Sequence, residues 1–131
     1  MQISAKVESR FHTQNTQVQT NDLARNLPIP VKPAGYGSAV NGGELLMLAL
    51  ATCFCNDIYR EAGKRNIAVS AVEVECTAEF GGEGEPGRNI QYTARVSADA
   101  SPDVIEELIR ATDQVAEIHN TLRQGVNVKL V

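Results

Sequence analysis

The sequence contains no tryptophan and few other aromatic residues. Its 131 residues include three Phe and three Tyr, although 43% of them are hydrophobic. The core must therefore be aliphatic, and a chain of this length buries only a moderate core by itself. We predict one domain spanning residues 1–131, which completes its core by pairing with a second copy as a homodimer.

The sequence also lacks an excess of positive charge and any long apolar run. The formal net charge is -4, so no excess of Lys and Arg attracts nucleic acid or an anionic membrane surface. No segment approaches the roughly 18 consecutive apolar residues that span a bilayer, and residues 1–9 lack the features of a signal peptide. We expect a cytoplasmic protein with no nucleic-acid or membrane partner.

The three cysteines do not form a disulfide framework or a metal motif. Their number is odd, and Cys53 and Cys55 point about 200° apart if they lie on one helix, so they cannot bond to each other. Both histidines are far from them in the sequence, which argues against zinc. The Gly-rich residues 34–43 lack the Lys and Ser/Thr of a phosphate loop. We therefore predict no metal and no cofactor.

The first half of the chain is predicted to form strands followed by a long helix. Alternating polar and apolar residues indicate a strand over 2–11, then a hairpin and a third strand over 24–29. Prolines and glycines make residues 28–43 a loop. The helix should run from Glu44 to Lys64, and it is apolar around its circumference as far as Cys55, which predicts that its first half is buried on every side.

The second half is predicted to form a hairpin, a helix and a last strand. Residues 67–80 and 90–99 flank a Gly-rich turn, with the acidic face of the first strand in water. Ser101 and Pro102 start a helix, a short helical turn ends at Gly125, and residues 126–131 form a strand. The inner stripe of that helix comprises Val104, Ile105, Leu108, Ile109, Thr112 and Val115. This order predicts an α+β fold with helices stacked on antiparallel sheet.

Two segments carry a resemblance to a known family. The sequence GGELLMLALATC, which ends at Cys53, and the following NDIYREAGKRNI resemble the central helix of the OsmC/Ohr-like proteins. The later VIEELIRATDQVAEIHNTL is similar to that family's second helix and the turn after it. The resemblance covers nearly the whole chain. It implies an intertwined α+β homodimer, and many members reduce organic hydroperoxides with two cysteines and a dithiol reductant.

The sequence departs from the peroxidases of this family at two places. Cys53 matches the cysteine that attacks the peroxide, but Ala116 and Glu117 stand where the second, resolving cysteine and its proline are expected. Gly43 replaces a glutamate that helps to position the thiolate. Glu44 is the nearest substitute, and it would have to act across the dimer because it projects opposite Cys53 on the helix. The spacing of nine residues from Glu44 to Cys53, with Asp57 and Ile58 after it, resembles a poorly characterised branch of the family that lacks the second cysteine.

Arginines of the N-terminal strands, Arg10 and Arg25, are candidates for lowering the pKa of the thiol, although we interpret both as solvated surface residues. We interpret Cys55 and Cys76 as core residues and His119 as a residue at a helix C-terminus, where its charge suits the dipole. Tyr36 is a candidate lid over a pocket.

Two functions follow from the resemblance. In the first, the protein is a one-cysteine thiol peroxidase that reduces organic hydroperoxides, with Cys53 as nucleophile, Glu44 assisting, and an external thiol reductant resolving the sulfenic acid. In the alternative, a non-catalytic homodimer of the same fold binds a small hydrophobic molecule in an interfacial pocket, and Cys53 only contributes to packing.

Overall fold

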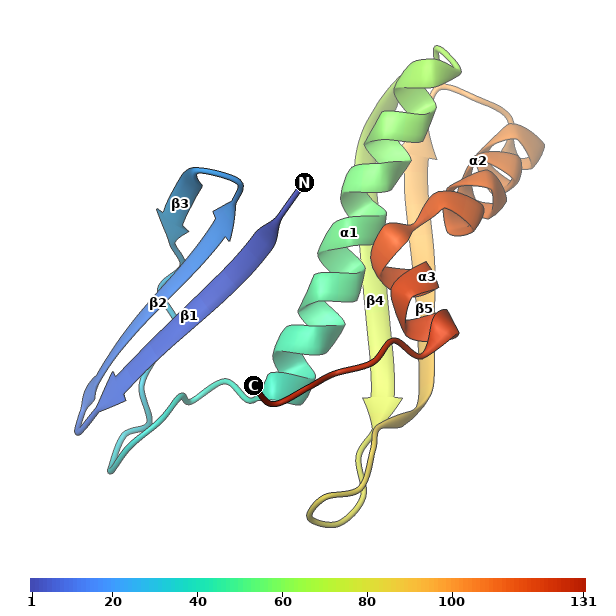
Figure 1. The fold of residues 1–131 in the computed structure, drawn as a ribbon. Coiled ribbons are helices and arrows are strands. Elements are labelled where there is room, and N and C mark those ends of the chain that lie inside the picture. The colour runs from blue at the N-terminus through green and yellow to red at the C-terminus, as the bar shows by residue number, and fades with distance from the viewer. The chain divides into compact units, whose positions relative to one another are not determined.

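The computed structural model describes all 131 residues and divides them into two compact units, residues 1–45 and 46–131. Its elements are β1 (Ile3–Arg10), β2 (Thr13–Thr20), β3 (Leu23–Asn26), α1 (Gly42–Lys64), β4 (Val69–Glu79), β5 (Arg88–Ala98), α2 (Pro102–Val115) and α3 (Glu117–Gln124) (Figure 1). The predicted α+β class is confirmed. None of the three helices is long and apolar enough to cross a membrane.

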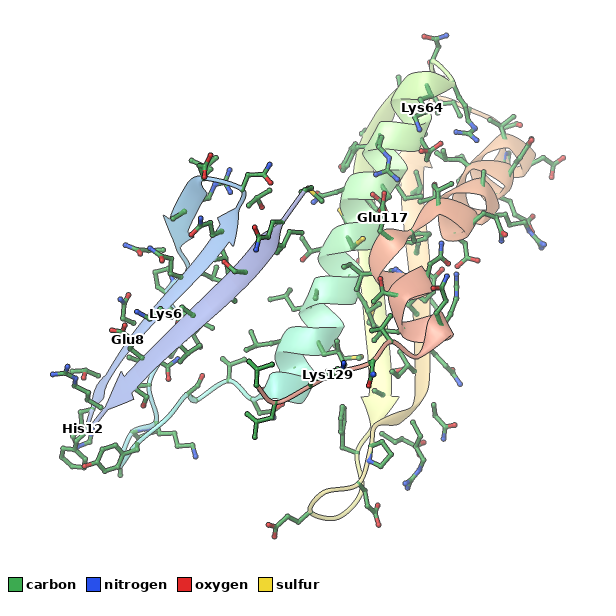
Figure 2. The ribbon with its side chains drawn as sticks, viewed as in Figure 1. Lys6, Glu8, His12, Lys64, Glu117 and Lys129 are labelled. Carbon is green, nitrogen blue, oxygen red and sulfur yellow. The ribbon has the colours of Figure 1, made fainter.

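The first unit is built around a three-stranded antiparallel sheet in the order β1-β2-β3. Its two hairpin turns hold His12 and Asn21 at φ values of 58° and 50°, the left-handed conformation that tight turns require. Lys6 and Glu8, two residues apart on β1, form an ion pair on one face of the sheet (Figure 2). The third strand is present, but it is shorter than the predicted range 24–29.

The second unit has an antiparallel hairpin, β4 and β5, with its helices on one face (Figure 1). Apolar side chains alternate along both strands, and Val72 pairs with Val96 while Cys76 pairs with Tyr92. This face contacts the core residues of the helices, which are Phe54, Ile58, Ala62, Leu108 and Ala116. The opposite face of β4 exposes its glutamates, as predicted. The hydrophobic core of this unit is therefore one layer of helices on two strands.

The ends of α2 and α3 follow the predicted signals. The Ser101 side chain accepts a hydrogen bond of 3.3 Å from the Val104 N–H, and Pro102 occupies the first helical position. Gly125 ends α3 at a φ of 64°. The buried stripe of α2 is narrower than predicted and is centred on Leu108 and Thr112. Val104 and Val115 are 39% and 41% exposed.

The prediction that the first half of α1 is buried on every side is wrong for the single chain. Leu50 and Phe54 are buried, but Leu48 is 59% exposed and Thr52 is also exposed. One layer of sheet covers only one side of a helix, so an apolar circumference does not by itself ensure burial. The exposed side of α1 leaves apolar surface without a partner.

The prediction of a last strand over residues 126–131 is also wrong. These residues form no regular element, and Val128 and Leu130 are 90% and 103% exposed. Their polar and apolar residues alternate, but strand formation depends on a neighbouring strand and on packing more than on intrinsic preference. No strand pairs with this segment in the chain.

Candidate functional site

The thiol of Cys53 lies next to a buried carboxylate. Cys53 and Asp57 are one turn apart on α1, a spacing that places their side chains on the same face. The Cys53 Sγ donates a hydrogen bond of 3.5 Å to the Asp57 Oδ2. Asp57 is only 5% exposed, whereas Cys53 is half-buried. The thiol therefore has a proton acceptor in contact while one side of it remains reachable from the surface.

The start of α3 adds a second carboxylate to this site. Glu117, the first residue of α3, lies on the side toward α1 (Figure 2), and its carboxylate lies within 4.8 Å of the Cys53 Sγ and of an Asp57 oxygen. Arg60 on α1 binds both acids, at 3.0 Å from the Asp57 Oδ1 and 3.1 Å from the Glu117 Oε1. One guanidinium thus holds two carboxylates around the thiol and links α3 to α1.

The pKa values of these groups follow from burial and charge. Burial raises the pKa of the Cys53 thiol, the Ile118 backbone N–H opposes this shift, and the negative charges of Asp57 and Glu117 add to it. Burial also raises the pKa of Asp57. The pKa of Glu117 is lowered by its own backbone N–H and by Arg60. Cys53 is therefore a protonated thiol at rest, and the pKa values of the two carboxyl groups beside it are shifted in opposite directions.

These three side chains also form a group of potential metal ligands. The group offers one sulfur, from Cys53, and two oxygens, from Asp57 and Glu117. It was not predicted from the sequence because Glu117 is distant from the other two residues along the chain. Arg60 already forms ion pairs with both carboxylates, so a metal ion would have to compete with its guanidinium. The site as it stands suits proton transfer better than cation binding.

The predicted site residue Glu44 lies at the start of α1. Its carboxylate accepts a hydrogen bond of 2.8 Å from the Asn41 N–H, and the Asn41 side chain accepts one of 2.8 Å from the Glu44 N–H. This reciprocal pair is a capping box, which satisfies two free N–H groups at a helix start. The structure does not bring Glu44 into the cluster of Cys53 and Asp57, and its role across a dimer stays a prediction.

The other candidate residues of the first unit lie on its surface. Arg10 and Arg25 are exposed on β1 and β3. Tyr36 is 66% exposed, and its ring lies 5.3 Å from the Phe11 ring. In the second unit, Cys55 and Cys76 are half-buried free thiols. Cys55 borders a shallow depression between α1 and β4.

The position matched to the family's second cysteine lies at the site. Ala116 is fully buried and directly precedes Glu117, which lies beside Cys53. In this chain the position holds only the methyl group of Ala116. The backbone N–H of Ile118, two residues further along the chain, acts to lower the pKa of Cys53.

The interpretation of His119 as a residue at a helix C-terminus is wrong. His119 lies in the first turn of α3 and is 5% exposed, with its ring centroid 5.5 Å from that of Phe54 and 4.5 Å from that of Tyr92. Burial lowers its pKa, so the imidazole is neutral. Neither ring nitrogen has a hydrogen-bond partner. Sequence reasoning missed this environment because its neighbours come from α1 and β5.

A cavity of about 220 Å³ opens beside His119. Its lining residues come from α1, β5 and α3 and are Leu50, Ile90, Tyr92, His119, Leu122 and Arg123. The Tyr92 hydroxyl donates to the Asp113 carboxylate, which Arg123 also binds at 2.5 Å. Burial, with the hydrogen bond to Asp113, raises the pKa of Tyr92 to about 12. The cavity lies within residues 46–131 of one chain, and Cys53 does not line it.

Comparison with protein families matches residues 35–131 to the OsmC-like protein family. None of the curated proteins compared matches the chain. An OsmC-like protein from Mycoplasma pneumoniae is similar in structure, with 20% identity and a TM-score of 0.65, and the match covers 99% of this chain and 96% of that one.

Two further solved structures are similar over most of their length. An OsmC-like protein of unknown function from Vibrio cholerae has 12% identity and a TM-score of 0.67, over 92% of this chain and 93% of that one. The organic hydroperoxide resistance protein OhrB of Bacillus subtilis has 21% identity and a TM-score of 0.55, over 97% and 96%. At these identities the likeness shows the fold.

Proposed function

Because this chain belongs to the OsmC-like protein family, we propose that it reduces organic hydroperoxides, with Cys53 as the nucleophile and an external thiol as the reductant. The observation that carries this proposal is the hydrogen bond of 3.5 Å from the Cys53 thiol to the buried Asp57 carboxylate. A similar solved structure is that of an organic hydroperoxide resistance protein, which supports the same substrate class.

In the proposed reaction, Asp57 first takes the proton of the Cys53 thiol. The thiolate then attacks the terminal oxygen of the hydroperoxide, so that an S–O bond forms while the O–O bond breaks. Asp57 returns the proton to the leaving alkoxide, which departs as an alcohol. Cys53 is oxidised to a sulfenic acid, and the peroxide is reduced by the same two electrons.

The second carboxylate has a separate part in this proposal. When Asp57 is protonated it no longer balances the charge of Arg60. Glu117 lies 3.1 Å from the same guanidinium and stays ionised, because its pKa is lowered. Arg60 and Glu117 therefore act as positioning residues that keep Asp57 in place in both protonation states.

The external reductant follows from the absence of a resolving cysteine at Ala116. A first external thiol attacks the sulfenic acid, releases water and forms a mixed disulfide, and a second external thiol restores Cys53. This cycle needs a compartment that keeps thiols reduced, as the cytoplasm does.

We also propose that two copies of the chain form a homodimer. Leu48, Val128 and Leu130 are 59%, 90% and 103% exposed, and apolar surface of this kind marks an interface. Glu44 enters the proposal here, as a residue that acts across the dimer interface.

A non-catalytic function is the second candidate, and one observation favours it. The pKa of Cys53 is raised by burial, whereas reactive cysteines generally have lowered values. In this alternative Cys53 remains a thiol throughout, and the protein binds a small hydrophobic molecule without turning it over.

Asp57→Asn distinguishes the two candidates. It removes the negative charge next to the thiol, so the pKa of Cys53 should fall and alkylation by iodoacetamide at pH 7 should become faster. If Asp57 carries the proton, reduction of cumene hydroperoxide should become slower in the same variant. Opposite changes in the two rates support the peroxidase. Wild-type protein should also be treated with one equivalent of cumene hydroperoxide and its intact mass followed over minutes. If Cys53 is not oxidised, the peroxidase proposal is wrong and the non-catalytic function is the better account.

A further inference from the structure

The cavity beside His119 has no part in the proposed peroxidase chemistry. We propose that it binds a small neutral amphipathic molecule, an alcohol or phenol, whose hydroxyl group hydrogen-bonds His119 and whose apolar body contacts Leu50, Ile90 and Leu122. The inference goes beyond the proposed function, because it requires no reaction at Cys53.

The first argument is the unsatisfied imidazole. His119 is 5% exposed, and both of its ring nitrogens are buried without a hydrogen-bond partner. Buried polar atoms in native proteins almost always have a partner, and an unpaired one is destabilising. His119 is itself part of the cavity wall, and a half turn of its ring exchanges the positions of carbons and nitrogens. A ligand in the cavity is therefore the nearest source of the missing hydrogen bond.

The second argument is the size and apolar character of the cavity. Its volume of about 220 Å³ exceeds the roughly 150 Å³ of an apolar cavity that holds benzene, and it is below the range of about 300–1,000 Å³ for drug-sized ligands. Leu50 is 2% exposed and forms a buried wall, whereas Ile90 and Leu122 are 40% and 38% exposed at its sides. A ligand of about one ring with short substituents fits this space.

The third argument is charge. The polar groups of Tyr92 and Arg123 are already bound to Asp113, and the charges of Arg123 and Asp113 cancel. Burial lowers the pKa of His119, so its neutral ring offers one donor and one acceptor. A hydroxyl group can both donate and accept, whereas a carboxylate would add an unbalanced charge to a largely apolar wall.

Phenol, benzene and benzoate test the proposal as matched probes, with binding measured by NMR titration of the full chain. We expect phenol to bind about tenfold more tightly than benzene, because one hydrogen bond contributes about that factor. Benzoate should bind more weakly than phenol. The signals of the His119 ring should shift with phenol and much less with benzene.

Three variants locate the site. His119→Phe keeps an aromatic ring but removes both nitrogens, so it should reduce the preference for phenol over benzene to about one. Leu122→Trp fills the cavity and should abolish binding of both. Val104→Trp adds the same ring at an exposed position of α2, outside the cavity lining, and should leave both unchanged. Cys53→Ser should also leave phenol binding unchanged. A failure of the peroxidase proposal would therefore appear in the assay of peroxide reduction, and a failure of the cavity proposal would appear in the phenol titration.

Several outcomes would overturn the inference. Wild-type protein that binds no phenol would show that ordered water, the protein's own side chains or a second copy of the chain occupy the cavity. If wild type and His119→Phe prefer phenol over benzene by the same factor, the imidazole does not bind the hydroxyl group. If His119→Phe does not fold, the shift of the wild-type His119 ring signals with phenol decides the question alone.

Discussion

Cys53 and His119 both lie where α1 meets α3, but their polar surroundings are opposite. Around Cys53 every polar group has a partner, because Asp57 accepts from the thiol and Arg60 binds both Asp57 and Glu117. His119 is more deeply buried and has no partner for either ring nitrogen. The difference suggests that protein groups alone complete the first site, whereas the second needs a ligand to complete it.

The two sites also share a structural support. Phe54 is fully buried on α1, between Cys53 and Cys55 in the sequence, and its ring contacts both Tyr92 and His119. The core of α1 therefore positions the thiol cluster and one wall of the His119 environment at once.

The largest expected effect is at Cys53 itself. Cys53→Ser should abolish reduction of cumene hydroperoxide, because a serine hydroxyl does not form the sulfenic acid, while the His119 cavity is unchanged. Loss of peroxide over time and intact mass after one equivalent of oxidant are the measurements. Retained peroxide consumption would assign the chemistry to Cys55 or Cys76.

Phe54→Ala should damage both sites through the core. Removing a fully buried phenylalanine typically lowers the free energy of unfolding by about 3–5 kcal/mol, through lost burial and the cavity left behind. Urea unfolding followed by circular dichroism measures this change. Tyr59→Ala is the matched control on the same helix, because Tyr59 is 46% exposed and should cost much less.

Ala116→Cys should convert the Cys53 site into one with an internal partner. The new thiol would lie directly before Glu117, which is beside Cys53, so oxidation should form a disulfide and remove two hydrogens in place of adding oxygen. Intact mass after cumene hydroperoxide distinguishes these products. Ala111→Cys, in the middle of α2, provides the control, and a disulfide there as well would show that the position is not specific.

Stability should depend on pH through His119. Its pKa in the folded state is lowered below the ordinary histidine value of 6.5, so the unfolded chain binds more protons between those two pKa values. The free energy of unfolding should therefore be highest above pH 6.5 and should decrease as the pH falls through this window. His119→Phe should remove that part of the decrease in thermal melts from pH 7.5 to pH 5, and an unchanged slope would contradict the assignment.

The smallest expected effect is at Glu44. Glu44→Gln weakens the capping box with Asn41 and should lower the free energy of unfolding by less than about 1 kcal/mol. Thermal melts measure this loss. The rate of peroxide reduction in the same variant tests the predicted action of Glu44 across the dimer, since a helix cap alone would leave the rate per folded protein unchanged.

Much of the secondary structure could be predicted because its signals are local. The alternation along β4, the cap at Ser101 and the stop at Gly125 each depend on a few neighbouring residues. The predictions that failed concern burial and pairing. The exposed Leu48 and the irregular tail after Gly125 depend on what other segments provide, which periodicity does not contain.

By itself, the sequence determined the helices, the hairpins, the α+β class and the family, because these follow from short-range patterns and from the motif that ends at Cys53. Only the tertiary structure decided which groups surround that cysteine and where His119 lies. Asp57 and Glu117 meet at the thiol because α3 turns back onto α1. The physical reason is that pKa shifts and unsatisfied hydrogen bonds arise from contacts between residues distant in the sequence.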